Sequence, residues 1–188
     1  MPLNIPNLLT WLRILLIPLI VGLFYLPDAW LSYEDRNVAA TVAFVIAAVT
    51  DWLDGYLARV LNQASAFGAF LDPVADKLMI AAALIVLLQL GRVDAVVALI
   101  IIGREIAISA LREWMAKIGQ AKSVAVAFIG KVKTVGQMVA IPLLLFEENL
   151  FGVIPCLWLG TILINIAAVL TVISMLYYLR RAVPAVPA

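Results

Sequence analysis

Residues 69–90 read AFLDPVADKLMIAAALIVLLQL, and residues 38–61 before them read VAATVAFVIAAVTDWLDGYLARVL. Each run is mostly apolar and, as a helix, is long enough to cross the hydrocarbon core of a bilayer. Similar apolar runs cover residues 8–27, 94–116, 132–147 and 151–179. Because a lone span satisfies its backbone polar groups only as a helix, the pattern predicts an all-α, polytopic membrane protein with six transmembrane helices.

The composition of the whole chain supports this interpretation. Of the 188 residues, 65% are hydrophobic and 13% are charged, and the mean hydropathy of +1.11 lies outside the range of soluble domains. Residues 1–182 are expected to form one six-helix domain, and the proline-containing tail 183–188 is expected to be disordered. The single cysteine, Cys156, excludes an intrachain disulfide, and the absence of histidine excludes His-ligated zinc sites and His-based triads.

Charged residues predict the orientation of the chain. The connections at 27–37 and 146–150 are rich in acids, whereas most lysines and arginines lie at the opposite ends of the runs. The positive-inside rule therefore places both termini in the cytoplasm. Residues 117–131 are less apolar than their neighbours and are expected to form an amphipathic segment along the cytoplasmic face.

Four aspartates lie in or beside the spans, where each unpaired charge costs about 2.5–3.5 kcal/mol. Asp51 and Asp54 share one helix face at i, i+3, and Asp72 and Asp76 share another at i, i+4. The short link around residues 62–66 predicts that the two helices are antiparallel neighbours, so the four carboxylates should converge. Oxygen donors without His or Cys favour Mg²⁺, Mn²⁺ or Ca²⁺, and four carboxylates suit a two-metal site.

Residues 51–76 also resemble the signature of a known family. Eight positions over these 26 residues match the CDP-alcohol phosphatidyltransferases, namely Asp51, Asp54, Gly55, Ala58, Arg59, Gly68, Asp72 and Asp76. The resemblance implies the fold of that family and transfer of a phosphatidyl group from CDP-diacylglycerol to an alcohol, with release of CMP. It also implies a homodimer in the bacterial inner membrane, with the active site on the cytoplasmic side.

The resemblance further implies roles for the matching residues. Asp51, Asp54 and Asp72 would bind Mg²⁺ or Mn²⁺, and Asp76 would complete that site and act as the general base. The CDP-diacylglycerol site would be formed by Asp54, Gly55, Ala58, Arg59 and Gly68. The flanking segments NIPNLLTWLR (4–13), REIAISALREW (104–114) and GKVKT (130–134) are similar to family members that use sn-glycerol 3-phosphate as the acceptor and make phosphatidylglycerophosphate.

An acceptor that carries its own phosphate needs a basic pocket near the acids. The residues expected to supply it are Thr10, Arg13, Arg104, Arg112, Lys131 and Lys133. For Arg112 and the two lysines, the alternative is a cationic cluster that contacts anionic lipid headgroups. For Arg13, the alternative is a side chain that extends to the membrane interface.

Other functions remain open at this point. The signature does not distinguish acceptors, so serine, inositol phosphate or phosphatidylglycerol are alternatives within the family. A divalent-cation transporter would need polar residues through the whole membrane thickness, and an intramembrane aspartyl protease would need only two acids. The expected partners are CDP-diacylglycerol, sn-glycerol 3-phosphate and membrane lipids, and no nucleic-acid partner is expected.

Overall fold

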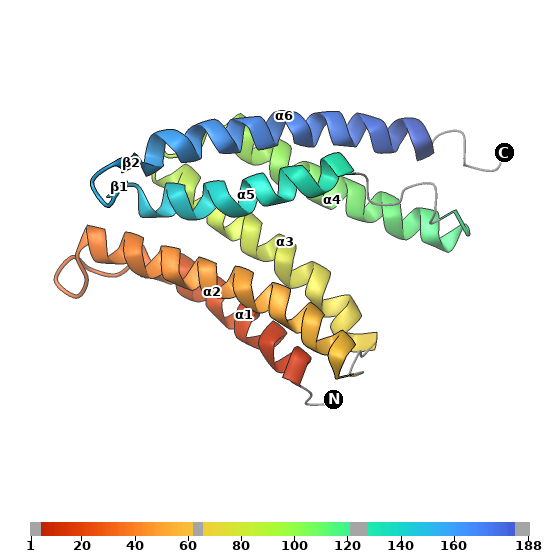
Figure 1. Ribbon diagram of the computed structural model, residues 1–188, viewed down its shortest axis with the longest axis horizontal. Coiled ribbons are helices and arrows are strands. Elements are labelled where there is room, and N and C mark those ends of the chain that lie inside the picture. Colours follow the sequence, from red (N-terminus) through yellow and green to blue (C-terminus); the bar gives the residue numbers. More distant parts are fainter. Residues whose placement is uncertain (1–4, 62–65, 121–127, 183–188) are drawn as a thin grey trace.

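The computed structural model describes residues 5–61, 66–120 and 128–182 (Figure 1). In these residues the chain forms six α-helices, α1 (Ile5–Leu23), α2 (Tyr33–Val60), α3 (Ala66–Gln89), α4 (Ala95–Lys117), α5 (Phe128–Phe146) and α6 (Cys156–Ala182). A short antiparallel hairpin of β1 (Asn149–Leu150) and β2 (Ile154–Pro155) joins α5 to α6. The all-α prediction is confirmed, whereas the predicted tail 183–188 and part of the predicted segment 117–131 lie outside the described residues.

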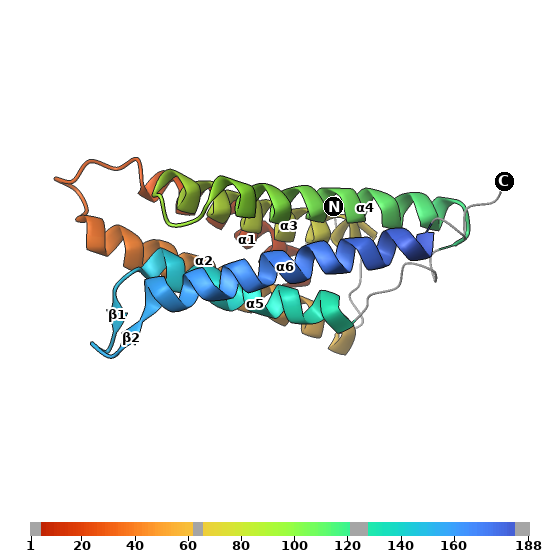
Figure 2. The same ribbon diagram turned by 90° about the horizontal axis from the view of Figure 1, so that it is seen from above.

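The helices pack around the bundle in the order α1, α2, α5, α6, α4, α3, and α3 packs back on α1 (Figures 1 and 2). The two helices that carry the aspartates, α2 and α3, make few direct contacts, because α1 packs along both of them. The prediction that α2 and α3 are close neighbours is therefore only partly right. The difference matters, because α1 brings its own polar side chains to the acids.

Small residues allow close packing inside the bundle. On α2, Ala40, Ala43 and Ala47 are buried on one face. A Cβ atom added to Gly160 of α6 would lie 2.8 Å from Cγ of Leu144 on α5. Glycine at this position therefore permits the close approach of α5 and α6, as small residues commonly do between membrane helices.

The outer surface of the bundle is suited to lipid. Large apolar side chains point outward, for example Leu15 of α1, which is 67% exposed, and Val169 of α6, which is 60% exposed. Among the described residues, two segments are long and apolar enough to span a bilayer, Tyr33–Leu57 in α2 and Cys156–Arg180 in α6. Exposed apolar surface and long apolar helices together suggest a membrane protein, and the number of spans stays a prediction.

A buried polar network holds the end of the bundle next to the hairpin. It centres on Arg92, in the turn between α3 and α4, which is 6% exposed. The guanidinium donates to five acceptors, which are the carbonyl oxygens of Leu144 and Leu145, the Tyr33 hydroxyl, Asn37 Oδ1 and Glu147 Oε2. The two carbonyls belong to the last turn of α5, so Arg92 caps that helix and ties it to α2.

Replacing Arg92 with lysine should lower the free energy of unfolding by about 1.5–3 kcal/mol, because an ammonium keeps the charge but cannot reproduce the planar fork of donors. Thermal unfolding in detergent would measure the change. The matched control is Arg180→Lys. Arg180 lies exposed near the end of α6, so this change should cost less than about 0.5 kcal/mol. Equal melting temperatures for the two variants would contradict the capping role.

Candidate active site

Three of the four signature aspartates meet around one arginine of α1. Arg13 is fully buried, and its Nη1 lies 2.9 Å from Asp51 Oδ1 and 2.5 Å from Asp76 Oδ1. Its Nη2 lies 2.5 Å from Asp54 Oδ2. One guanidinium thus joins carboxylates of α2 and α3, and the predicted convergence of these three acids is present.

The fourth acid is held by the same face of α1. Thr10, three residues before Arg13, donates its hydroxyl to Asp72 Oδ1 at 2.7 Å, and its Oγ1 also lies 3.4 Å from Asp54 Oδ2. Thr10 and Arg13 were predicted to line the acceptor cleft near the acids, and this stays a prediction; the structure places both side chains against the aspartates. An arginine with three carboxylate partners is not simply a side chain extending to the membrane interface.

The acids differ in their access to solvent. The side chain of Asp54 is 4% exposed, whereas those of Asp51 and Asp76 are 32% and 35% exposed. Asp51, Asp72 and Asp76 line a cavity, and Asp54 does not. Asp54 therefore lies behind the other three, where it supports Arg13.

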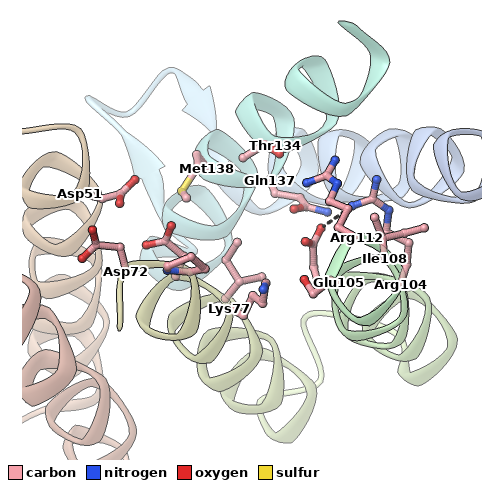
Figure 3. A pocket seen from close by; sticks show the side chains of 14 residues that line it. Asp51, Asp72, Lys77, Arg104, Glu105, Ile108, Arg112, Thr134, Gln137 and Met138 are labelled. Carbon is pink, nitrogen blue, oxygen red and sulfur yellow. Dashed lines mark hydrogen bonds and ion pairs between the residues drawn. The ribbon is translucent and has the colours of Figure 1, made fainter. Parts of the chain in front are cut away.

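That cavity, which we call the polar cavity, has a volume of about 460 Å³ and lies inside the bundle between α2, α3, α4 and α5 (Figure 3). Its lining side chains are Asp51, Asp72, Pro73, Asp76, Lys77, Ile80, Arg104, Glu105, Ile108, Ser109, Arg112, Thr134, Gln137 and Met138. Figure 3 shows the aspartates at one end and the two arginines, with Glu105, at the other. The cavity therefore has an acidic end and a basic end.

The basic end is built by α4 with help from α5 and α6. Arg104 donates to Glu105 Oε1 at 3.2 Å and to Ser174 Oγ at 3.1 Å. Lys133 of α5, which is 2% exposed, also donates to Glu105 Oε1. Lys133 is thus held against Glu105, so its ammonium orients that carboxylate and is less available to an acceptor phosphate than predicted.

The charges at the basic end do not balance. Arg104, Arg112 and Lys133 carry three positive charges, and in the part of the chain that the structure describes the carboxylate beside them is Glu105, which pairs with Arg104 and Lys133. The Nε atoms of Arg104 and Arg112 are buried without a hydrogen-bond partner among the described groups. Arg13 and Arg92 share this feature, so it is the uncompensated positive charge beside the cavity that favours a bound anion such as a phosphate dianion.

The acidic end has the opposite imbalance, since three of its carboxylates share one guanidinium and the fourth, Asp72, is held by the Thr10 hydroxyl. Hard oxygen donors and negative charge suit Mg²⁺ or Mn²⁺. Within residues 5–61, 66–120 and 128–182, however, no group of three or more acidic or cysteine side chains is positioned to hold a metal ion. The residues therefore fit a divalent cation in chemistry and charge, but its binding would require the Arg13 guanidinium to move away from them.

Several predicted site residues have a less direct place in the structure. The side chains of Ala58, Arg59 and Lys131 lie outside the described part. Gly55 has open space beside it, since an added Cβ atom would meet nothing within 4 Å. This open space favours the interpretation that Gly55 leaves room for a ligand over the interpretation that it permits close helix packing. Gly68 is buried near the start of α3.

The structure adds polar residues that sequence reasoning missed. Thr134 and Gln137 of α5 line the polar cavity. Ser174 and Tyr178 of α6 contact the arginines from behind. The available signal was the spacing of these pairs, at i, i+3 and i, i+4 in otherwise apolar runs, because buried polar groups in a membrane helix need partners.

Comparison with known proteins identifies the family. The model of the CDP-alcohol phosphatidyltransferase family matches residues 3–173. A CDP-diacylglycerol–glycerol-3-phosphate 3-phosphatidyltransferase of Shigella flexneri serotype 5b (strain 8401) is 50% identical over 184 residues, covering 97% of this chain and 96% of the relative. The Escherichia coli (strain K12) protein of the same name is similar to the same extent. With the family pattern matched over most of its length and its four signature acids held together by Thr10 and Arg13 of α1, the chain belongs to the CDP-alcohol phosphatidyltransferase family.

Proposed function

We propose that the protein transfers the phosphatidyl group of CDP-diacylglycerol to sn-glycerol 3-phosphate, giving phosphatidylglycerophosphate and CMP. The names of the relatives that are 50% identical over nearly the whole chain support this acceptor. The observation that carries the proposal is the pairing of an acidic end and a basic end within one cavity. Such a cavity suits one substrate that reacts at a pyrophosphate and another that carries a separate phosphate.

In the proposed reaction, the 1-hydroxyl oxygen of glycerol 3-phosphate attacks the phosphorus that bears diacylglycerol. The new P–O bond forms as the bond from that phosphorus to the bridging oxygen of CMP breaks, and CMP leaves with the electron pair. Asp76 takes the hydroxyl proton. Its position on the cavity wall, with Oδ1 held by Arg13, supports this role because it leaves the carboxylate oriented and accessible.

The proposed cofactor is Mg²⁺ or Mn²⁺, in two ions held by Asp51, Asp54, Asp72 and Asp76. Such ions, when bound, neutralise the charge that develops on the pyrophosphate oxygens. Among this chain's own groups, Thr10 orients Asp72 through its hydroxyl. Asp54, Gly55, Ala58, Arg59 and Gly68 are proposed to form the CDP-diacylglycerol site, as in the family signature.

The acceptor phosphate is proposed to bind at the basic end, between Arg104 and Arg112. The excess positive charge there supports this assignment. A phosphate accepts paired hydrogen bonds from guanidinium groups, which gives orientation as well as charge neutralisation. Lys131 remains proposed on sequence grounds alone, and Lys133 contributes through Glu105.

The membrane arrangement is proposed from the sequence. Residues 1–182 would form one domain of six spans, with both termini and the polar cavity toward the cytoplasm of a bacterial inner membrane. Figure 1 supports placing both termini on one side of the membrane, because the start of α1 and the end of α6 both lie away from the hairpin of β1 and β2. A homodimer is proposed from the family resemblance.

The acceptor is tested by CMP release from purified protein in detergent with CDP-diacylglycerol, Mg²⁺ or Mn²⁺, and one candidate alcohol at a time. Glycerol 3-phosphate should support turnover at least about 100-fold faster than glycerol, because glycerol has no phosphate to bind the arginines of the basic end. Serine, inositol phosphate and phosphatidylglycerol complete the panel. Removal of divalent ions with EDTA should abolish turnover, and Mn²⁺ should restore it.

Two outcomes would contradict the proposal. Faster turnover with serine, inositol phosphate or phosphatidylglycerol would assign a different acceptor within the family. Undiminished turnover in EDTA would exclude the proposed metal ions. A cation transporter, by contrast, would release no CMP with any acceptor and would carry Mn²⁺ into sealed vesicles.

A further inference from the structure

Helix α6 holds the two arginines of the polar cavity from outside it. All the described residues that line the cavity come from α2, α3, α4 and α5. Tyr178 of α6 is nevertheless in contact with both guanidinium groups. Its ring centroid lies 5.5 Å from Cζ of Arg104 and 5.1 Å from Cζ of Arg112. The Arg112 Nη2 also donates to the Tyr178 hydroxyl at 3.1 Å.

The burial of Tyr178 makes this contact rigid. The residue has an exposed fraction of 0% and packs in a small cluster with Ile108, Met115 and Ala182. Ser174, one turn earlier on α6, is also fully buried and accepts from Arg104 Nη2 at 3.1 Å. Two side chains of α6 therefore determine where the donor groups of both arginines lie.

Electrostatics explains why such support is needed. Arg104 and Arg112 lie on one face of α4 and carry like charges, so their guanidinium groups would move apart without support. Their long side chains also have many rotamers, so unsupported groups would not stay in one place. The negative face of an aromatic ring attracts both cations at once. A fixed pair of guanidinium groups needs no rearrangement when a phosphate arrives, which lowers the entropic cost of binding.

We propose that Tyr178, together with Ser174, is a positioning residue that fixes Arg104 and Arg112 as a preformed site for the acceptor's phosphate. This inference rests on the proposed function, because it assumes a phosphorylated acceptor. Tyr178 does not touch the reacting atoms, and its effect on the reaction passes through the two arginines.

The test is a comparison of KM values for the two substrates. Tyr178→Leu removes both the ring and the hydroxyl and should raise the KM for glycerol 3-phosphate about 10-fold or more, with the KM for CDP-diacylglycerol within about twofold of wild type. Tyr178→Phe keeps the ring and should raise the acceptor KM only about threefold, as should Ser174→Ala. Inorganic phosphate should inhibit Tyr178→Leu more weakly than wild type.

Tyr177→Leu is the matched control. Tyr177 is the adjacent residue, and its ring packs edge-on against Tyr178 at a centroid distance of 5.8 Å. This variant loses an equal volume beside the same cluster, so it should leave the acceptor KM within about twofold of wild type. A similar rise in the KM for glycerol 3-phosphate in Tyr177→Leu and Tyr178→Leu would show that the effect comes from lost packing, and this would overturn the proposal.

The outcomes separate this inference from the proposed function. Wild-type protein that releases no CMP with glycerol 3-phosphate would refute the proposed acceptor, whatever the variants do. Active wild-type protein whose Tyr178 variants change both KM values equally, or change only thermal stability, would refute the positioning role. If Tyr178→Leu does not fold, Tyr178→Phe provides the test. An unchanged KM for glycerol 3-phosphate in Tyr178→Phe would also refute the positioning role.

Discussion

Asp76→Asn is expected to lower kcat for phosphatidyl transfer about 10²–10⁴-fold, the range that a positioned general base contributes. Asparagine has nearly the same shape but cannot accept the hydroxyl proton. The side chain lines the polar cavity and contacts Arg13, so the amide can still occupy the same place. CDP-diacylglycerol should still bind the variant, which a rise in melting temperature on adding this lipid would show. The rate is measured as CMP release with saturating substrates.

The control for Asp76 is Glu113→Gln, another exchange of carboxylate for amide. Glu113 lies on α4 with its side chain 70% exposed, where it pairs with Lys117 at 2.9 Å. It does not line the polar cavity, so kcat should stay within about twofold of wild type. Near-normal activity of Asp76→Asn would show that the base is another group. Loss of activity in both variants would point to a general effect of removing a negative charge from the protein.

Arg13→Gln is expected to lower the free energy of unfolding by about 3–5 kcal/mol in the absence of divalent ions, because it removes one partner of a buried set of ion pairs. The guanidinium is fully buried and contacts Asp51, Asp54 and Asp76. Without it, those acids lose their shared counter-ion in a region of low dielectric. Melting curves in detergent with EDTA would measure the loss.

Divalent ions should stabilise the Arg13→Gln protein more than the wild type, since an ion then meets no competing guanidinium among the carboxylates. The comparison requires melting curves with EDTA and with Mn²⁺ for both proteins. Arg180→Gln, which removes an exposed arginine near the end of α6, is the control and should melt like wild type. Equal melting temperatures of Arg13→Gln and wild type in EDTA would show that Arg13 does not balance the negative charge of the carboxylates. Mn²⁺ without effect on either protein would argue against a metal site there.

The helices and the acid cluster were predictable because both depend on local spacing. An apolar run long enough to span a bilayer is predicted to be a helix, because only a helix satisfies the backbone hydrogen bonds within the segment. The six observed helices follow those runs closely. The i, i+3 and i, i+4 spacings of Asp51 with Asp54 and of Asp72 with Asp76 predict two shared faces in the same way. Family resemblance then supplied roles that spacing does not contain.

The partners of Thr10, Arg13 and Lys133 could not be predicted, since each depends on packing between distant segments. Thr10 and Arg13 were identified as polar residues of one helix face, but their partners depend on α1 packing along both α2 and α3. Lys133 was predicted to bind phosphate, yet it is held by Glu105 of the neighbouring helix. The sequence signal for Tyr178 is its i, i+4 spacing from Ser174, and this spacing does not say that its ring contacts two arginines of α4.

The sequence by itself determined the class of fold, the family and the presence of four acids on two helix faces, because periodicity and motif are properties of neighbouring residues. Only the tertiary structure decided that Arg13 lies at the centre of those acids and that α6 supports the arginines of the basic end. The physical reason is that charges in a buried site are balanced by whichever helices pack beside them, and packing order is a property of the whole chain.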